Sequence, residues 1–339
     1  MTNIRDLTYE ELESLILSLG EKKYRAVQIF EWLNKGAESF DDLKNIPKSL
    51  KEKLGENYYI HGLTIVRKLE SKIDNTKKYL FGLHDGNMVE SVVMYYKHGI
   101  TVCISSQVGC AMGCKFCAST IGGLVRSLSA GEILEQVIFA QKDIGERISN
   151  IVMMGIGEPL ANFDNVIRFL HNVNDERGLN IGYRHISLST CGIVPKIIEL
   201  SKYKFPITLS ISLHSTTDES RSSIMPVNNT YNIKMLIDAC KTYQDECNRR
   251  ISFEYAMIKG VNDSIQHAQN LVKLLNGLMC HVNVIPVNNV DENNFEKPDS
   301  ATIKAFCDYL ERSGITATVR RELGSDINAS CGQLRKNNM

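Results

Sequence analysis

The sequence lacks any run of apolar residues that approaches the roughly 18 needed to cross a lipid bilayer. Its first residues, MTNIRDLTYEELESL, carry acidic side chains where a secretory signal peptide would carry a basic and then an apolar stretch. It also lacks a net charge, because 39 Lys and Arg residues balance 39 Asp and Glu residues. We therefore expect a cytosolic protein without membrane contact, in which any polyanion must bind local basic clusters such as Arg320 and Arg321.

Internal repeats and low-complexity segments are absent as well. The 339 residues, 43% of them hydrophobic, suffice for one large barrel-like domain and a smaller module. We expect an N-terminal accessory region with short linking strands over residues 1–95. A core domain with a C-terminal extension should occupy residues 96–339.

Ten cysteines are present, and a reducing compartment does not favour a disulfide framework, so close cysteine clusters indicate metal or redox chemistry. Cys110, Cys114 and Cys117 form a C-x3-C-x2-C cluster. A structural zinc site would need a fourth ligand, yet no second C-x2-C or H-x3-5-H pair occurs, and Cys103 or His214 could serve only by an accident of folding. Three thiolates suit an iron-sulfur cubane that keeps one iron open.

Residues 1 to about 55 have helical patterns. Leu12, Leu15, Ile16 and Leu19 repeat along one helix face, and Thr8 with Glu11 resembles a capping box. A second amphipathic helix is expected over 22–34 and a third after residue 47. Three strand-like stretches follow before residue 97.

From residue 99 onward, apolar strands alternate with amphipathic helices. Strands are expected at 100–105, 150–155, 185–190, 207–213, 251–257, 281–286 and 315–320. Helices are expected at 129–145, 163–175, 194–202, 233–246, 264–277 and 300–313. This alternation predicts right-handed βαβ units and a parallel sheet, either open or closed into a barrel. Such folds place their sites at the carboxyl ends of the strands, where the cysteine cluster and the polar stretches fall.

The cysteine cluster, with Phe116 before its last cysteine, resembles the signature of radical S-adenosylmethionine enzymes. In these enzymes the open iron chelates S-adenosylmethionine, and the reduced cluster cleaves it to a 5'-deoxyadenosyl radical. The stretch GIGEPL at 155–160 is similar to the Gly-Glu-Pro loop of that superfamily. The resemblance implies a [4Fe-4S] cluster and S-adenosylmethionine as cofactors, and a partial (β/α)6 barrel as the α/β fold.

Longer motifs are similar to the RlmN/Cfr family of adenosine methyltransferases, which act on carbon 2 or carbon 8 of one adenosine in 23S rRNA. They are VCISSQVGC, SLHSTTDESRSSIMPVN, FEYAMIKGVND, HVNVIPVN and INASCGQLR. This resemblance runs from about residue 24 to residue 335. It implies that the N-terminal helices form a helix-hairpin-helix-like accessory domain that contacts RNA.

The resemblance also implies the catalytic residues. Carbons 2 and 8 of adenine are too electron-poor to attack the methyl group of S-adenosylmethionine. A thiolate, assigned to Cys331, therefore takes the methyl group first, and the radical then activates it for addition to adenine. Cys103 is the resolving thiol, against the alternative of a buried strand cysteine. Glu90 matches the proton acceptor, against the alternative of a surface residue on an edge strand.

The resemblance also implies which residues contact S-adenosylmethionine. They are Gly157, Glu158, Ser189, Ser212, Leu213, His214 and Asn288. The implied partners are 23S rRNA, with a subset of tRNAs as a further substrate, and a reducing donor such as flavodoxin or ferredoxin. We expect a monomer.

The motifs resemble the RlmN branch, and two alternatives stand beside it. One is methylation of carbon 8 by a Cfr-type enzyme, which would confer antibiotic resistance. The other is a zinc-bound RNA-binding module without catalysis.

Overall fold

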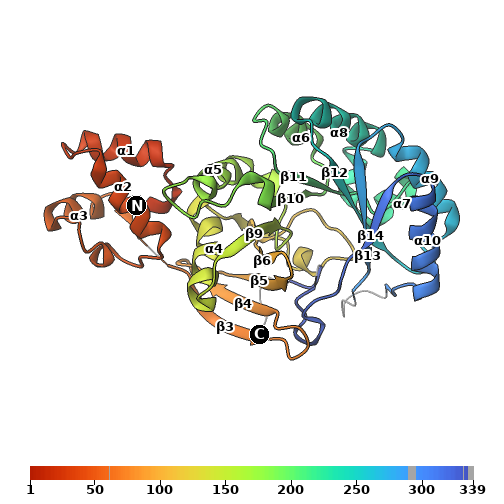
Figure 1. The fold of residues 1–339 in the computed structure, drawn as a ribbon, viewed down its shortest axis with the longest axis horizontal. Helices are drawn as coiled ribbons and strands as arrows, with labels where there is room; N and C mark the ends of the chain where they lie inside the picture. The colour runs from red at the N-terminus through yellow and green to blue at the C-terminus, as the bar shows by residue number, and fades with distance from the viewer. Residues whose placement is uncertain (61, 289–294, 331, 335–339) are drawn as a thin grey trace.

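The computed structural model describes residues 1–60, 62–288, 295–330 and 332–334. Figure 1 shows a helical N-terminal lobe beside a larger α/β body whose strands lie inside an arc of helices. No helix among these residues combines the length and the apolar character that a membrane span requires.

The N-terminal lobe has its own hydrophobic core. It contains α1 (Tyr9–Ser18), α2 (Tyr24–Asn34) and α3 (Lys48–Gly55), whose apolar faces pack together. The expected capping box is present, because the Thr8 hydroxyl accepts from the Glu11 amide and the Glu11 carboxylate accepts from the Thr8 amide. Strands β1 (Thr2–Asn3) and β2 (Tyr58–Tyr59) pair and close the lobe.

A buried ion pair joins this lobe to the α/β body. The Arg5 guanidinium lies 2.9 Å from the Glu135 carboxylate on α4 (Ala130–Ile144), and both side chains are 1% exposed. Asn3 donates a further hydrogen bond of 3.0 Å to the same carboxylate. Burial raises the pKa of Glu135 to about 7, and the charge of Arg5 opposes that rise.

One ten-stranded sheet forms the α/β body, in the order β14-β13-β12-β11-β10-β9-β6-β5-β4-β3. Seven neighbouring strands are parallel: β6 (Gly99–Cys103), β9 (Ile148–Met153), β10 (Ile186–Thr190), β11 (Thr208–Ser212), β12 (Ile251–Met257), β13 (Cys280–Pro286) and β14 (Thr316–Val319). Because β14 lies at an edge of the sheet, the barrel is open, and the expected partial (β/α)6 barrel is confirmed with a seventh strand added.

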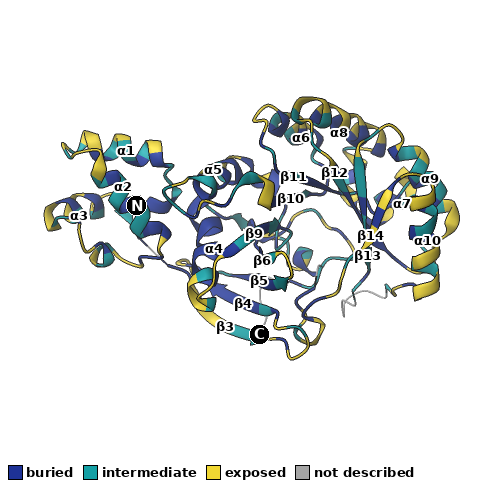
Figure 2. Ribbon diagram, viewed as in Figure 1, coloured by how far each residue is buried: buried dark blue, intermediate teal, exposed yellow. Residues whose placement is uncertain are grey.

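Helices α4 to α10 connect these strands. Besides α4 they are α5 (Phe163–Asn174), α6 (Val194–Ser201), α7 (Asp218–Ile224), α8 (Ile233–Cys247), α9 (Ile265–Leu275) and α10 (Ser300–Arg312). Figure 2 shows their exposed outer faces and the buried strands inside the arc. One continuous apolar core fills the space between the helices and the outer face of the sheet.

The three linking strands extend the same sheet. They are β3 (Thr64–Glu70), β4 (Lys77–Gly82) and β5 (Met88–Tyr96), which pair antiparallel with each other and with β6. Hydrogen bonding is therefore continuous across residue 95, where the sequence suggested a boundary. The division at that residue stays a prediction.

Three short elements of the α/β body went unpredicted. Strands β7 (Gln107–Gly109) and β8 (Leu124–Ser127) form a hairpin that brackets the cysteine loop, and the short helix α7 follows β11. All three are too short to show a clear periodicity in sequence.

Candidate functional site

A cavity of about 160 Å³ opens at the carboxyl ends of the parallel strands. The loop between β7 and β8 forms one wall, and the ends of β9 to β13 form the others. Nine of the residues selected from the sequence line it: Cys110, Cys114, Cys117, Gly157, Glu158, Ser189, Ser212, His214 and Asn288. The expectation that these residues meet at one face of the barrel is therefore confirmed.

The cysteine wall is desolvated. Cys110 and Cys114 are buried, and burial raises the pKa of the Cys110 thiol to about 12 and also raises the pKa of Cys114. Repulsion from the thiolate of Cys117 raises both pKa values further. Such thiols ionise only beside a strong positive charge, so these residues are suited to a metal centre.

The number of donor groups favours a polynuclear centre. Cys110, Cys114 and Cys117 supply three thiolates, whereas a structural zinc site takes four protein ligands. A cubane that keeps one iron open binds three thiolates, each through a different iron. The three cysteines of this wall therefore fit an iron-sulfur cluster better than a single zinc ion.

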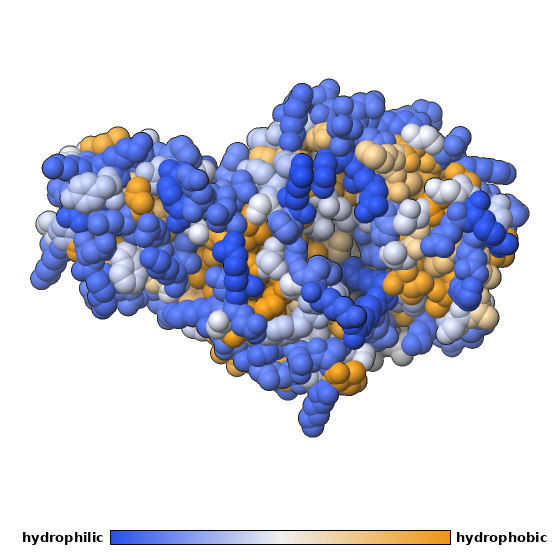
Figure 3. Space-filling model, in the orientation of Figure 1, coloured by the Kyte–Doolittle hydropathy of each residue, from blue (hydrophilic) through white to orange (hydrophobic). Residues whose placement is uncertain are grey.

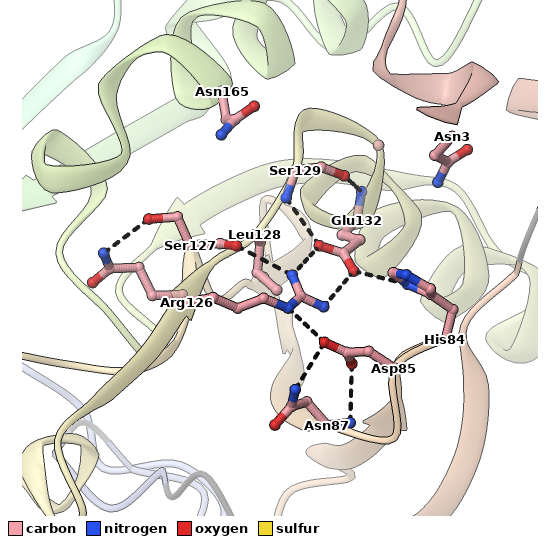
Figure 4. Close-up of polar contacts among 12 residues, drawn as sticks. Asn3, His84, Asp85, Asn87, Arg126, Ser127, Leu128, Ser129, Glu132 and Asn165 are labelled. Carbon is pink, nitrogen blue, oxygen red and sulfur yellow. Dashed lines mark hydrogen bonds and ion pairs between the residues drawn. The ribbon is translucent and has the colours of Figure 1, made fainter. Parts of the chain in front are cut away.

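The hairpin that carries the cysteine loop is held by Arg126 on β8. Its guanidinium donates two hydrogen bonds to the Glu132 carboxylate (2.7 and 2.8 Å) and one to Asp85 (2.6 Å). Figure 4 shows this fork between the β4-β5 turn and the start of α4, with His84 on the other side of Glu132. Arg126 also holds the pKa of Asp85 well below its usual range.

Glu158 fixes the next loop. Its carboxylate accepts hydrogen bonds from the amides of Cys191 (2.7 Å) and Leu160 (3.0 Å), and burial raises its pKa. The preceding Gly157 has a φ of 105°, and a Cβ there would lie 2.6 Å from the side chain of Gln107. Only glycine fits this left-handed, crowded position.

His214 contributes a neutral imidazole. Its Nδ1 accepts a hydrogen bond from the Ala256 amide (2.8 Å), which leaves the proton on Nε2. Burial, and then the charge of Arg221, lower the pKa of His214 to about 3. The ring of Phe116 packs edge-on against it, with 4.8 Å between centroids.

Leu213 differs from its neighbours. Its side chain lies in the apolar core rather than on the cavity wall, and its carbonyl accepts from Arg221. Neither of the two cavities described here includes Leu213 in its wall.

A second cavity of about 720 Å³ adjoins the first and shares Met154, Ile285, Val287, Asn288 and Arg320 with it. Cys103 lies on its wall, and four basic residues line it: Lys297, Lys304, Arg320 and Arg321. The C-terminal segment forms another wall of this cavity, through residues 319–323, 325, 328–330, 333 and 334.

Glu90 lies beneath this C-terminal segment rather than on a surface. It is 1% exposed and forms an ion pair of 2.8 Å with Lys78, which is 3% exposed. Lys78 also donates to the carbonyl of Asn328 (3.1 Å). The two cavities described here do not include Glu90 in their walls.

Cys331 lies outside the described residues, but both of its neighbours are placed. The Ser330 hydroxyl donates to the carbonyl of Leu323 (3.1 Å), and the Gly332 carbonyl accepts from the Ala118 amide (2.7 Å). The chain around residue 331 thus contacts the cysteine loop directly.

Comparisons with known proteins agree with this geometry. Residues 104–272 match the radical SAM superfamily, and residues 2–60 match the ribosomal RNA large subunit methyltransferase N-terminal domain. Relatives named "Probable dual-specificity RNA methyltransferase RlmN" from Clostridium novyi and Clostridium acetobutylicum are each 56% identical, over 99% of this chain and 98% of their own. The chain belongs to the RlmN family.

The crystal structure of a radical SAM methyltransferase from Sphaerobacter thermophilus is 43% identical to this RlmN-family chain. It covers 99% of this chain and 100% of its own length, with a TM-score of 0.94. The protein is therefore a radical SAM methyltransferase, and the relatives support the RlmN branch over the Cfr branch. The alternative of a non-catalytic zinc module is wrong. Enzymes of this superfamily generally use S-adenosylmethionine and a [4Fe-4S] cluster.

Sequence reasoning missed three buried charged residues at or behind the site of this RlmN-family chain: Lys78, Arg221 and Glu254. Glu254 lines the first cavity and accepts from Asn283 (2.7 Å), and its carboxylate lies 3.9 Å from Arg320. A charge inside an apolar strand, as in ISFEYAM, is a signal that could have identified Glu254.

The Lys78–Glu90 ion pair leads to a stability prediction. Lys78→Met should lower the free energy of unfolding by about 3–5 kcal/mol, because it leaves the Glu90 carboxylate buried without its cation. The adjacent Lys77→Met is the control, since Lys77 pairs with a largely exposed Glu70 and should cost less than about 1 kcal/mol. Urea unfolding monitored by circular dichroism measures both. Equal losses for the two variants would contradict the buried pair.

Proposed function

We propose that this protein methylates carbon 2 of an adenosine in 23S rRNA, and the equivalent carbon of an adenosine beside the anticodon of some tRNAs. One observation carries the proposal. The cysteine-walled cavity shares five wall residues with a larger cavity that bears Cys103, and the two neighbours of Cys331 line these cavities, Gly332 the first and Ser330 the second. The names of the relatives support RNA as the substrate.

The first cavity holds the cofactors. Cys110, Cys114 and Cys117 bind one [4Fe-4S] cluster. Gly157, Glu158, Ser189, Ser212, His214 and Asn288 orient S-adenosylmethionine, together with the backbone of Leu213. When bound, these groups supply a one-electron cleavage that yields a carbon radical. Desolvated walls and neutral His214 keep water and stray protons away from that radical.

The second cavity holds the target base. Adenine must leave its stack to reach a site inside a barrel, and the adjoining volume of about 720 Å³ can accept an extruded nucleotide. Arg320, Arg321, Lys297 and Lys304 supply positive charge for the phosphates around it. This local positive charge is needed because the chain as a whole has no net charge.

Cys331, Glu90 and Cys103 each carry out one part of the covalent reaction. The Cys331 thiolate displaces the methyl group from one S-adenosylmethionine, and a second one serves to activate the resulting S-methyl group. Addition of the carbon radical would leave one unpaired electron on the ring, which would return to the iron-sulfur group held by Cys110, Cys114 and Cys117, and Glu90 accepts the proton of the ring carbon. The Cys103 thiolate then attacks the Cys331 sulfur, so that a disulfide forms, the sulfur-carbon bond breaks, and the released carbon gains a proton to become methyl.

Glu90 needs a rearrangement before it can act. Its carboxylate is paired with Lys78, and Lys78 also bonds to Asn328, three residues before Cys331. We propose that Glu90 separates from Lys78 when the C-terminal segment moves. This movement belongs to the step in which the carbon bound to Cys331 is delivered to adenine.

Mass spectrometry tests the proposal as a whole. Anaerobically reconstituted protein, S-adenosylmethionine, a reducing donor such as flavodoxin or ferredoxin, and a 23S rRNA fragment should yield 2-methyladenosine. Detection of 8-methyladenosine instead would assign the protein the Cfr-type reaction. A tRNA substrate in a parallel reaction tests the second specificity.

Removal of the resolving thiol should trap the reaction. Cys103→Ala should accumulate a covalent RNA–protein adduct and reduce turnover by at least about a hundredfold, because no thiol then attacks the Cys331 sulfur. Denaturing gel electrophoresis with labelled RNA detects the adduct. Cys307→Ala, which removes another thiol on the wall of the same cavity, is the control and should turn over normally. Clean turnover by Cys103→Ala would assign resolution to another group.

A further inference from the structure

Arg221 is a buried cation that none of the reaction steps above uses. It lies on α7, has 0% of its surface exposed, and ranks among the largest fully buried side chains. Among the described residues, no Asp or Glu forms an ion pair with it, although buried arginines usually need one. Its cost of burial must therefore be offset by other groups.

Backbone carbonyls supply most of its hydrogen-bond partners. Its Nη2 donates to the carbonyls of Cys191 (2.7 Å) and Ser212 (3.0 Å), and its Nε donates to that of Leu213 (3.0 Å). Its Nη1 donates to the side-chain oxygen of Asn228 (3.0 Å). One planar guanidinium therefore fastens the ends of β10 and β11 to each other and to α7.

These strand ends line the cofactor cavity. The Cys191 peptide is held from both sides, since its amide donates to Glu158 and its carbonyl accepts from Arg221. Ser189, Cys191 and Ser212 all belong to the cavity wall. Arg221 is not part of that wall, so it acts on the cavity through the residues it holds.

The same helix supports the cysteine loop. The carbonyl of Ile224, at the end of α7, accepts from the amide of Lys115 (3.0 Å), and Ile224 packs in one apolar cluster with Cys114 and Cys191. Burial raises the pKa of the Cys114 thiol, and the positive charge of Arg221 opposes that rise. The guanidinium thus lies behind the loop whose cysteines must be anionic to bind metal.

We propose that Arg221 is a positioning residue with two effects on the cofactors. The hydrogen bonds that its guanidinium donates hold the carboxyl ends of β10 and β11 in the arrangement that binds S-adenosylmethionine. Its fixed positive charge stabilises the more negative, reduced state of the cluster on Cys110, Cys114 and Cys117, because net charge near a cluster sets its reduction potential. The inference rests on the proposed function, which supplies the cluster.

Two substitutions separate these effects. Arg221→Met removes both the charge and these hydrogen bonds, whereas Arg221→Lys keeps the charge and loses the guanidinium that donates them. Arg147→Met is the matched control, because Arg147 is exposed at the amino end of β9 and donates to the carbonyl of Asn180. Each protein is reconstituted anaerobically, and its iron content, cluster midpoint potential and affinity for S-adenosylmethionine are measured.

Arg221→Met should load iron, but the midpoint potential of its cluster should be about 59 mV lower than that of the wild type. This shift corresponds to a tenfold change in the one-electron reduction equilibrium. Arg221→Lys should keep the wild-type potential and bind S-adenosylmethionine about tenfold more weakly. Arg147→Met should match the wild type in both measurements.

An unchanged potential in Arg221→Met with a full cluster would overturn the electrostatic effect. Wild-type affinity in Arg221→Lys would overturn the positioning effect. If Arg221→Met does not fold, Asn228→Ala tests positioning with the charge intact, and Arg221→Lys still shows whether charge alone maintains the potential. Failure of the wild type to load iron would instead refute the proposed function.

Discussion

Cys331→Ala is expected to reduce methylation by at least about a thousandfold, while iron binding and cleavage of S-adenosylmethionine continue. No other nucleophile can replace the thiolate that first takes the methyl group, because the ring carbon itself is too electron-poor to attack. The cluster should persist, because its ligands Cys110, Cys114 and Cys117 are unchanged. Loss of product with retained deoxyadenosine formation would therefore separate the carrier from the radical source.

Liquid chromatography with mass spectrometry measures methyladenosine and deoxyadenosine in the same reaction. Cys280→Ala is the control, because Cys280 begins β13 at the opposite end of the strand from the cavity and should leave both products unchanged. Methyladenosine formed by Cys331→Ala at more than trace levels would remove Cys331 from the mechanism.

Cys114→Ala is expected to lose the cluster and all activity. Two thiolates do not retain a cubane, and the buried position of Cys114 leaves water as a poor substitute ligand. Its iron content should fall to near background and its visible absorbance should disappear. Cleavage of S-adenosylmethionine should stop as well, which distinguishes this variant from Cys331→Ala.

Iron and sulfide analysis and anaerobic absorbance spectra check this result. Cys247→Ala is the control, because Cys247 is half-buried on α8 and donates to the carbonyl of Ser201 rather than facing the cavity. A Cys114→Ala protein that retained full iron would show that the cluster has other ligands. Stoichiometric zinc in the colourless wild-type protein would contradict the iron assignment altogether.

Much of the fold could be predicted from local patterns. The seven parallel strands and their long helices lie close to the expected ranges, because alternating apolar strands and amphipathic helices carry their own periodicity. Figure 3 shows that the face in view is largely hydrophilic, as expected when the apolar sides of these strands and helices turn inward. The β7-β8 hairpin and α7 were missed, since each has too few residues to show a period.

The candidate site was predicted unevenly for a related reason. Cys110, Cys114 and Cys117 are close in sequence, so their spacing alone indicated a shared centre. The environment of Glu90 was not predictable, since its cation Lys78 bonds in turn to a carbonyl 250 residues away. Glu90 consequently proved to be a buried, paired residue rather than a surface residue of an edge strand.

By itself the sequence determined the αβ alternation, the trio of cysteines and the motifs that mark the family, because these depend on neighbouring residues. Only the tertiary structure decided that Arg221 joins two strand ends, that two cavities adjoin, and that the C-terminal segment lies on the cysteine loop. Backbone carbonyls and packed surfaces have no signature in sequence, so contacts made through them become visible only when the chain is folded.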